Sequence, residues 1–162
     1  MKAIVVTDQA AGTAGMKLVE RPEPQAAIND VVVEVYASGF VPTELAWPST
    51  WTDRLDSDRT PSIPGHELAG VVTALGYGTT GLSVGQRVFG LADWHRDGTL
   101  AEYVAIDFVV ESDRAQLSEI VQRMRDGRLR TNIGTVAPLD DAVAAFNSTE
   151  RRPGKTVIRV RP

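Results

Sequence analysis

The sequence predicts a mainly β fold with a few helices, arranged as an antiparallel barrel or sandwich. Short apolar runs rich in Val and Ile fill the first two thirds of the chain, separated by Gly, Pro, Asp and Ser. Val31, Val33 and Val35 fall on one face of an extended chain, whereas Glu34 and Tyr36 fall on the other. This alternation is typical of antiparallel strands with one buried face. With 162 residues, the chain has the size of a single domain.

The expected elements follow from the spacing of apolar residues. Six strands are expected at 2–7, 16–20, 31–37, 68–75, 87–91 and 101–106. Asp113 and Gln116 then have the spacing of a helix cap, and the apolar residues after them predict an amphipathic helix over 114–126 that ends near Gly127. The chain is completed by a strand at 133–137, a short helix at 140–147, a turn at 153–154 and a strand at 155–160.

Composition argues against several classes of function. The net charge of −4 and the pI of about 5.2 are opposite to the basic surface that binds nucleic-acid phosphates, so no nucleic-acid partner is expected. The absence of cysteine removes disulfides, thiolate nucleophiles and thiolate metal ligands. The apolar run near Met1 is too short for a signal peptide or a membrane span, so we expect a cytoplasmic protein without a membrane partner.

A dinucleotide-binding sheet has no place in this pattern, because it needs several parallel strands joined by crossover helices. Gly76, Gly78 and Gly81 do reproduce the Gly-x-Gly-x-x-Gly spacing of such sites. In those sites the glycines lead a strand into a helix whose N-terminus faces the pyrophosphate. Here another turn and a strand are predicted to follow, so we interpret the motif as a loop and expect no cofactor-binding residues in this chain.

Three motifs carry a resemblance to a known family. They are Ile-Pro-Gly-His-Glu-Leu-Ala-Gly-Val-Val at 63–72, Val-Gly-Gln-Arg-Val-Phe-Gly at 84–90 and Gly-Thr-Leu-Ala-Glu-Tyr-Val at 98–104. In this order and spacing they resemble the medium-chain dehydrogenase/reductase family, in particular its quinone oxidoreductase and zinc-type alcohol dehydrogenase branches. Residues 135–146 and 154–158 are similar to the C-terminal segment of that family.

The resemblance implies a chaperonin-10 (GroES)-like barrel, the catalytic domain of such a dehydrogenase, without a Rossmann domain. It implies a single domain over 1–162, formed by an N-terminal segment (1–106) and a C-terminal segment (107–162). The family's nucleotide-binding domain normally lies between these segments. The implied function is therefore the substrate-binding part of an NAD(P)H-dependent oxidoreductase for small carbonyl, enone or quinone compounds, unable to transfer hydride on its own.

The resemblance also indicates His66, Glu67 and Thr43 as candidate catalytic residues. His66 is interpreted as a general acid at the substrate carbonyl, because imidazole titrates near neutral pH; the alternative is a histidine packed against the cleft wall. Thr43 stands where the zinc branch has a hydroxyl that relays a proton, and its alternative role is to satisfy turn backbone.

A catalytic zinc is not expected in this chain. Val41 stands where the zinc branch has a cysteine ligand, and zinc needs three or four ligands in a tetrahedral array. His66 and Glu67 alone do not complete such a site. The alternative is a replacement ligand from Glu44, Asp93 or His95.

Aromatic residues supply the candidate substrate contacts: Phe40, Trp47, Trp51, Trp94 and His95. Aromatic side chains in a cleft suit a flat conjugated ligand, although packing in the core or in an interface is a common role for tryptophan. Without the nucleotide-binding domain, the face that carries these tryptophans would be uncovered. We therefore expect a homodimer through that face.

Two further functions remain open at this stage. One is a cofactor-independent isomerase or cyclase that uses the same cleft for acid–base chemistry. The other is a non-enzymatic binding or assembly module.

Overall fold

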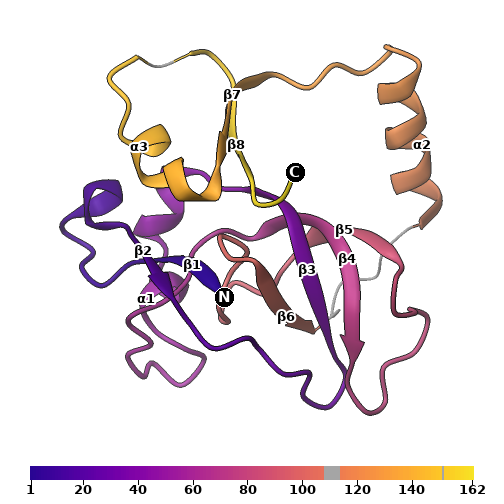
Figure 1. The fold of residues 1–162 in the computed structure, drawn as a ribbon, viewed down its shortest axis with the longest axis horizontal. Helices are drawn as coiled ribbons and strands as arrows, with labels where there is room; N and C mark the ends of the chain where they lie inside the picture. Colours follow the sequence, from indigo (N-terminus) through magenta and orange to yellow (C-terminus); the bar gives the residue numbers. More distant parts are fainter. Residues whose placement is uncertain (108–113, 151) are drawn as a thin grey trace.

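The structure is a computed structural model that describes residues 1–107, 114–150 and 152–162. Strands dominate it, as the sequence predicts, with short helices between them (Figure 1). The strands are β1 (Lys2–Val5), β2 (Lys17–Glu20), β3 (Asp30–Gly39), β4 (Glu67–Leu75), β5 (Arg87–Leu91), β6 (Tyr103–Asp107), β7 (Ile133–Pro138) and β8 (Lys155–Arg159). The helices are α1 (Pro48–Trp51), α2 (Arg114–Arg125) and α3 (Ala142–Phe146), with 3-10 turns η1 (Gly12–Gly15), η2 (Pro42–Ala46) and η3 (Leu139–Asp141).

Each strand and each helix that the sequence predicts is confirmed, with shifts of a few residues at the ends. The sequence patterns do not reveal η1, η2 or α1, which fall in segments without a clear apolar period. The predicted cap at Asp113 lies outside the described residues. None of the described helices is long and apolar enough to cross a membrane.

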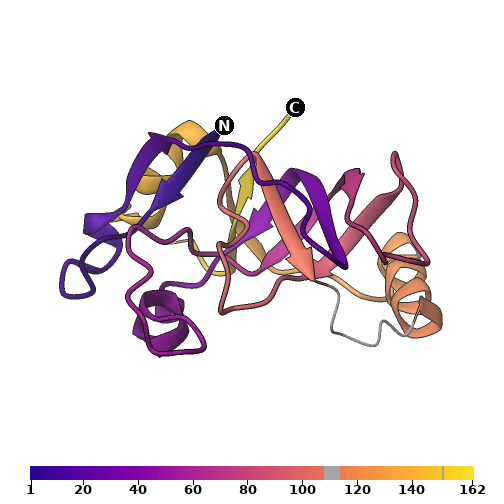
Figure 2. The same cartoon turned by 90° about the horizontal axis from the view of Figure 1, so that it is seen from below.

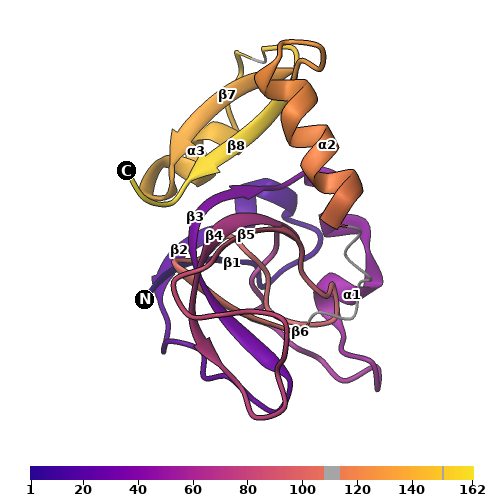
Figure 3. The same ribbon diagram turned by 90° about the vertical axis from the view of Figure 1, so that its right-hand side faces the viewer.

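Strand β3 lies at the centre of a six-stranded sheet with the order β5-β4-β3-β8-β7. It pairs along one edge with β4 and along the other with two strands in succession, β6 at its start and β8 at its end. Ala37, Ser38 and Gly39 are the positions that pair with β8. The C-terminal strands are thereby joined to the barrel that the N-terminal strands form, and they lie together with α3 on one side of it (Figure 3).

One strand pair departs from the antiparallel arrangement that we expect. Strands β7 and β8 are parallel, and η3 and α3 form the connection between them. Parallel neighbours need such a crossover because a tight hairpin cannot join them. The antiparallel arrangement that the sequence predicts from the first two thirds of the chain therefore does not extend to this C-terminal pair.

Two groups of buried side chains form the core. One contains Val31, Val33 and Val35, all fully buried as their alternation predicts, packed with residues of β4 and β6. The other combines the two ends of the chain, because Ile4 and Phe40 pack there with Phe146 and Ile158. The aromatic rings of Phe40 and Phe146 meet edge to face with centroids 4.7 Å apart.

A buried ion pair anchors the loop between β5 and β6, which carries Trp94. Arg96 donates two hydrogen bonds to the Asp30 carboxylate, at 2.7 and 2.6 Å. These bonds are the main reason why the pKa of Asp30 is lowered, although its burial opposes the shift. The backbone carbonyl of Asp30 also accepts hydrogen bonds from Gly76 and Thr79. Asp30 therefore connects two loops to the start of β3.

We predict that Arg96→Ala destabilises the fold by about 2 kcal/mol, because it leaves the Asp30 carboxylate buried without its charged partner. Urea unfolding followed by circular dichroism measures this change. Arg128→Ala is the matched control, since Arg128 pairs with Asp126 on the surface and should contribute less than about 0.5 kcal/mol. Equal losses in the two variants would contradict the assignment.

Candidate functional site

The backbone that presents His66 is held in one conformation. Gly65 has φ +91°, in the left-handed region that favours glycine, and a Cβ there would lie 3.0 Å from Thr99 and Leu100 atoms. The Gly65 carbonyl accepts a hydrogen bond from the Thr99 amide at 2.8 Å, and the His66 carbonyl accepts one from the Ala92 amide at 2.7 Å. His66 therefore enters the site directly before β4 from a fixed turn.

Two tryptophans enclose the His66 side chain. Its ring is stacked on that of Trp47, with centroids 5.8 Å apart and an interplanar angle of 12°. Trp94 meets both rings edge to face at 6.4 Å. His66 is 5% exposed, whereas Trp47 and Trp94 are 38% and 47% exposed. The structure thus brings together three of the predicted site residues, with the polar ring at the base and the indoles at the surface.

His66 is an uncharged group at neutral pH. Its pKa is lowered to about 4, mainly by burial and secondarily by the charge of Arg59, while Asp93 opposes the shift. Neither ring nitrogen has a hydrogen-bond partner among the described residues. The expectation that His66 titrates near neutral pH is therefore wrong, while its role as a catalytic residue stays a prediction. The neutral ring can still donate one hydrogen bond and accept another.

Glu44 is a second buried polar group beside His66. Its Oε2 atom lies 3.6 Å from His66 Nε2 and accepts the Gly65 amide at 3.2 Å, while Oε1 accepts the Val41 amide at 3.0 Å. Burial raises the pKa of Glu44, and the two amide bonds act in the opposite direction. From the sequence, Glu44 is expected only as a replacement metal ligand. The signal for its position is the helix-cap spacing between Val41 and Glu44.

Charged side chains hold the loop that carries Trp94, and two of them, Arg59 and Asp93, also act on the charge of His66. The Arg59 side chain is 12% exposed and donates hydrogen bonds to the carbonyls of Ser49 at 2.5 Å and Trp94 at 3.2 Å. Arg54 pairs with Asp93 at 2.5 Å, and Asp93 accepts the His95 amide at 3.0 Å. Arg59 and Arg54 thus fix the loop that holds Trp94 over His66.

The other predicted site residues lie elsewhere. Phe40 is 1% exposed in the core, and Trp51 is half-buried against that core and donates its ring N–H to the Leu45 carbonyl at 2.9 Å. Glu67 forms an ion pair with Lys155. Thr43 is exposed on η2, and His95 lies beside Asp93. The structure does not bring these five side chains into the Trp47–His66–Trp94 cluster.

The residues present do not fit a zinc site. Zinc needs three or four N, O or S ligands, and no group of three such side chains converges among the described residues. Among the described carboxylates, Glu44 is the one within 4 Å of a His66 ring nitrogen, and Val41 has no ligand atom in its side chain. Asp93 is instead engaged with Arg54 and His95.

The glycine motif is a loop, as the sequence predicts. Gly76, Gly78 and Gly81 lie in the connection between β4 and β5, and the described chain forms no helix between these strands. The glycine motif therefore does not form the strand–turn–helix site that holds a pyrophosphate.

The chain belongs to the alcohol dehydrogenase GroES-like domain family, whose profile matches residues 27–112. It thus has the catalytic-type domain of the medium-chain dehydrogenase/reductases. It is 39% identical over 93 residues to an L-threonine 3-dehydrogenase of Saccharopolyspora erythraea, which covers 56% of this chain and 25% of that protein. A second L-threonine 3-dehydrogenase, from Ruegeria pomeroyi, is 36% identical over 87 residues, or 52% of this chain and 24% of that protein. The matched part of the chain thus spans about a quarter of the length of these relatives.

Solved structures confirm the fold. A thermostable alcohol dehydrogenase from Pyrobaculum aerophilum superposes with a TM-score of 0.73 at 15% identity, over 98% of this chain and 99% of that chain. A quinone oxidoreductase from Coxiella burnetii superposes with a TM-score of 0.57 at 21% identity, over 85% and 48% of the two chains. At these identities the comparison establishes the architecture, not the substrate.

We predict a pH-dependent loss of stability that His66 causes. Below its unfolded pKa of 6.5 the unfolded chain binds a proton, whereas the folded chain binds it only near pH 4. The free energy of unfolding should therefore fall as the pH decreases from 6.5 to 4, by up to about 3 kcal/mol from this group.

Urea unfolding of the parent, His66→Phe and His95→Gln across this pH range tests the prediction. The His66→Phe variant should lose this part of the slope, and His95→Gln should retain it. An identical slope in the parent and in His66→Phe, or a His66 ring resonance that titrates near pH 6.5, would refute it.

Proposed function

We propose that this chain is the substrate-binding part of a medium-chain oxidoreductase, and that its ligand is a small flat carbonyl, enone or quinone compound. The observation that carries the proposal is a neutral, unpartnered imidazole at the base of two partly exposed indoles. Aromatic rings offer a conjugated ligand surfaces for stacking, and a donor at the base orients its carbonyl oxygen. The Trp47–His66–Trp94 cluster has both features.

Ligand entry requires one of the indoles to move. Both ring nitrogens of His66 are inaccessible in the closed cluster. Trp94 is the more exposed indole, and its ring lies at 88° to the His66 ring and is not stacked on it. Rotation of the Trp94 side chain would open a slot above His66, into which a flat ligand could slide parallel to the Trp47 ring. Arg59 would hold the backbone of Trp94 in place during this movement.

Hydride transfer requires a nicotinamide cofactor, which the described residues are not arranged to hold. In a doubly wound nucleotide-binding sheet the pyrophosphate lies at a helix N-terminus after a parallel strand. The parallel strands described here, β7 and β8, are joined by η3 and the five-residue α3. On this proposal the described residues bind substrate weakly, and hydride transfer needs a nucleotide-binding domain in addition to them.

Ligand binding is predicted to perturb one histidine and not the other. The chain has only His66 and His95, so their ring resonances can be followed separately in a titration with 1,4-naphthoquinone. The His66 ring should shift with saturation while His95 changes little. Trp94→Ala should weaken binding about three- to tenfold, because one stacking surface is lost. Trp51→Phe is the matched control, since Trp51 packs outside the cluster.

A shift at His95 alone, or equal weakening by Trp94→Ala and Trp51→Phe, would refute this site.

The second candidate function is a cofactor-independent isomerase, which is favoured by the 3.6 Å approach of Glu44 to a histidine that is already neutral at pH 7. Turnover of an enone without nicotinamide would support that alternative over the first proposal.

We also propose that the chain forms a two-fold homodimer through the face that carries Trp47 and Trp94. Trp47 and Trp94 are large apolar side chains about two-fifths exposed, and such surface is commonly covered by a second copy. Trp51 does not contribute in the way the sequence suggests, because it packs against the core.

Light scattering over a concentration series should show a dimer for the parent and a shift toward monomer for Trp94→Ser. Trp51→Phe serves as the control and should remain dimeric. A monomeric parent at high concentration would overturn the proposal, and a fully dimeric Trp94→Ser variant would exclude this face as the interface.

A further inference from the structure

A second recess lies far from the tryptophan cluster, between α2 and the outer face of the sheet. Helices α1 and α2 occupy opposite ends of the molecule (Figures 1 and 2), and the recess belongs to the α2 end. Its volume is about 700 Å³, within the range of small-molecule pockets. Residues of β3, β4 and β5 form one wall, and α2 forms the other. We call it the α2 groove.

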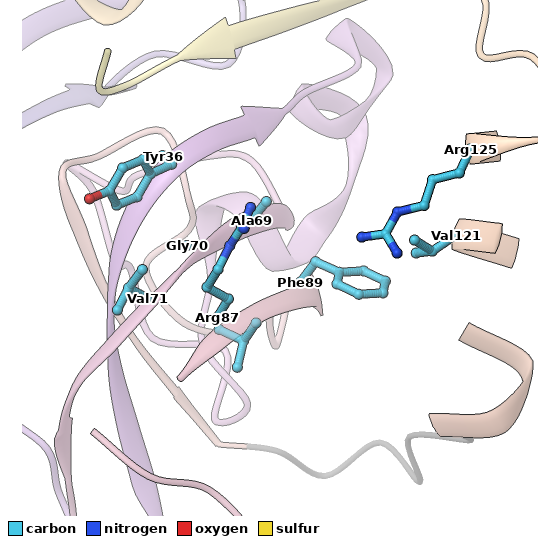
Figure 4. Close-up of a pocket in the computed structure, with 9 residues that line it drawn as sticks. Tyr36, Ala69, Gly70, Val71, Arg87, Phe89, Val121 and Arg125 are labelled. Carbon is cyan, nitrogen blue, oxygen red and sulfur yellow. The ribbon is translucent and has the colours of Figure 1, made fainter. Parts of the chain in front are cut away.

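Most of the lining of the α2 groove is apolar. Phe89 points from β5 toward Val121 of α2, with Val71 and Tyr36 farther along the sheet (Figure 4). Phe89 and Tyr36 are 47% and 40% exposed, so their rings are not covered by the rest of the described chain. An apolar recess with exposed rings is stabilised when an apolar group enters it and displaces water.

The helix is also incompletely packed. Ile120 and Met124 on α2 are 44% and 42% exposed, although their spacing places them on one apolar face. A helix of 12 residues is marginally stable in water without such packing. Ile120 and Met124 do not line the α2 groove, so a ligand there would add contacts to α2 through Val121 and Arg125 instead.

Two cationic side chains reach the groove from opposite walls. Arg87 extends from β5 and Arg125 from the last turn of α2 (Figure 4). Among the described residues, the ion pairs of this region join Arg123 to Glu119 and Arg128 to Asp126, and none involves Arg87 or Arg125. The described residues that line the groove include no acidic side chain. The groove therefore combines an apolar floor with two guanidinium groups that are available to an anion.

The excess of positive charge is local to the segment that contains α2. The whole chain carries −4, but residues 114–130 contain five arginines and only two acidic residues. A nucleotide polyphosphate fits poorly, because most of the lining offers no polar partner. A metal ion fits poorly as well, since carboxylate ligands are missing from the lining. One anionic head on an apolar body matches both parts of the groove.

We propose that the α2 groove binds an amphipathic carboxylate, with its carboxylate between Arg87 and Arg125 and its apolar body along Phe89, Val121 and Val71. The site is separate from the Trp47–His66–Trp94 cluster and does not depend on the function proposed for that cluster. The proposed occupant is a free small molecule and not a second copy of the chain.

The experiment is a titration of the isotope-labelled full chain with sodium decanoate below its micelle concentration, followed through the backbone amide resonances. Saturable shifts should be confined to β4, β5 and α2. The paired variant Arg87→Gln/Arg125→Gln should raise the dissociation constant about tenfold or more, because two charge-assisted hydrogen bonds are lost. Arg123→Gln is the matched control on the same helix and should bind like the parent. The uncharged 1-decanol should bind at least about tenfold more weakly than decanoate.

Four results would overturn the proposal. The first is the absence of saturation with decanoate, and the second is equal binding of 1-decanol. The third is equal weakening by Arg123→Gln and by the paired variant. The fourth is a set of shifts that depends on protein concentration alone, which would show that a second copy fills the groove. Circular dichroism of each variant confirms that α2 is retained.

Discussion

The structure depends on the pairing of β3 along both of its edges. This ten-residue strand contacts β4 throughout and divides its other edge between β6 and β8. Its valines fill one core, while its end at Ser38 and Gly39 receives the C-terminal strand. Because β3 continues into the turn that carries Glu44 and Trp47, and β4 starts directly after His66, this pair of strands positions two of the three rings of the tryptophan cluster. The third ring, Trp94, lies in the loop that Arg59 and Arg96 hold.

Burial determines the chemistry of that cluster more than residue type does. A histidine followed by a glutamate is, on sequence alone, a pair of groups available for proton transfer. In the fold their environments differ, since the His66 ring is enclosed by indoles and Glu67 faces Lys155 on the surface. The group that accompanies His66 is Glu44, from a segment about 20 residues earlier in the chain. The base of the site is thus a polar but neutral imidazole at pH 7, and the nearby positive charge belongs to Arg59.

The fold was largely predictable from the sequence, and the site only in part. Alternation of apolar residues located the strands because each has one face in the core, as Val31, Val33 and Val35 illustrate. The parallel pairing of β7 with β8 was not predictable, because strand direction is set by the path of the chain in three dimensions. The path of the chain also decides where the two tryptophans lie. Trp47 stacks on His66 in the site, whereas Trp51, four positions later, packs against the core. The pKa of His66 depends on tertiary burial, for which the sequence carries no local signal.

The contact between β3 and β8 also has a consequence for how the chain acquires its structure. Residues 37–39 pair with residues about 120 positions later in the chain. The core around Ile4 and Phe40 is likewise incomplete until Phe146 and Ile158 pack against it. Closing so long a loop costs entropy before the new contacts compensate it, so folding is slow compared with that of proteins rich in local contacts. During synthesis the first half of the chain emerges while that apolar surface is still open. The nascent protein therefore presents a period of aggregation risk that lasts at least until β8 has left the ribosome.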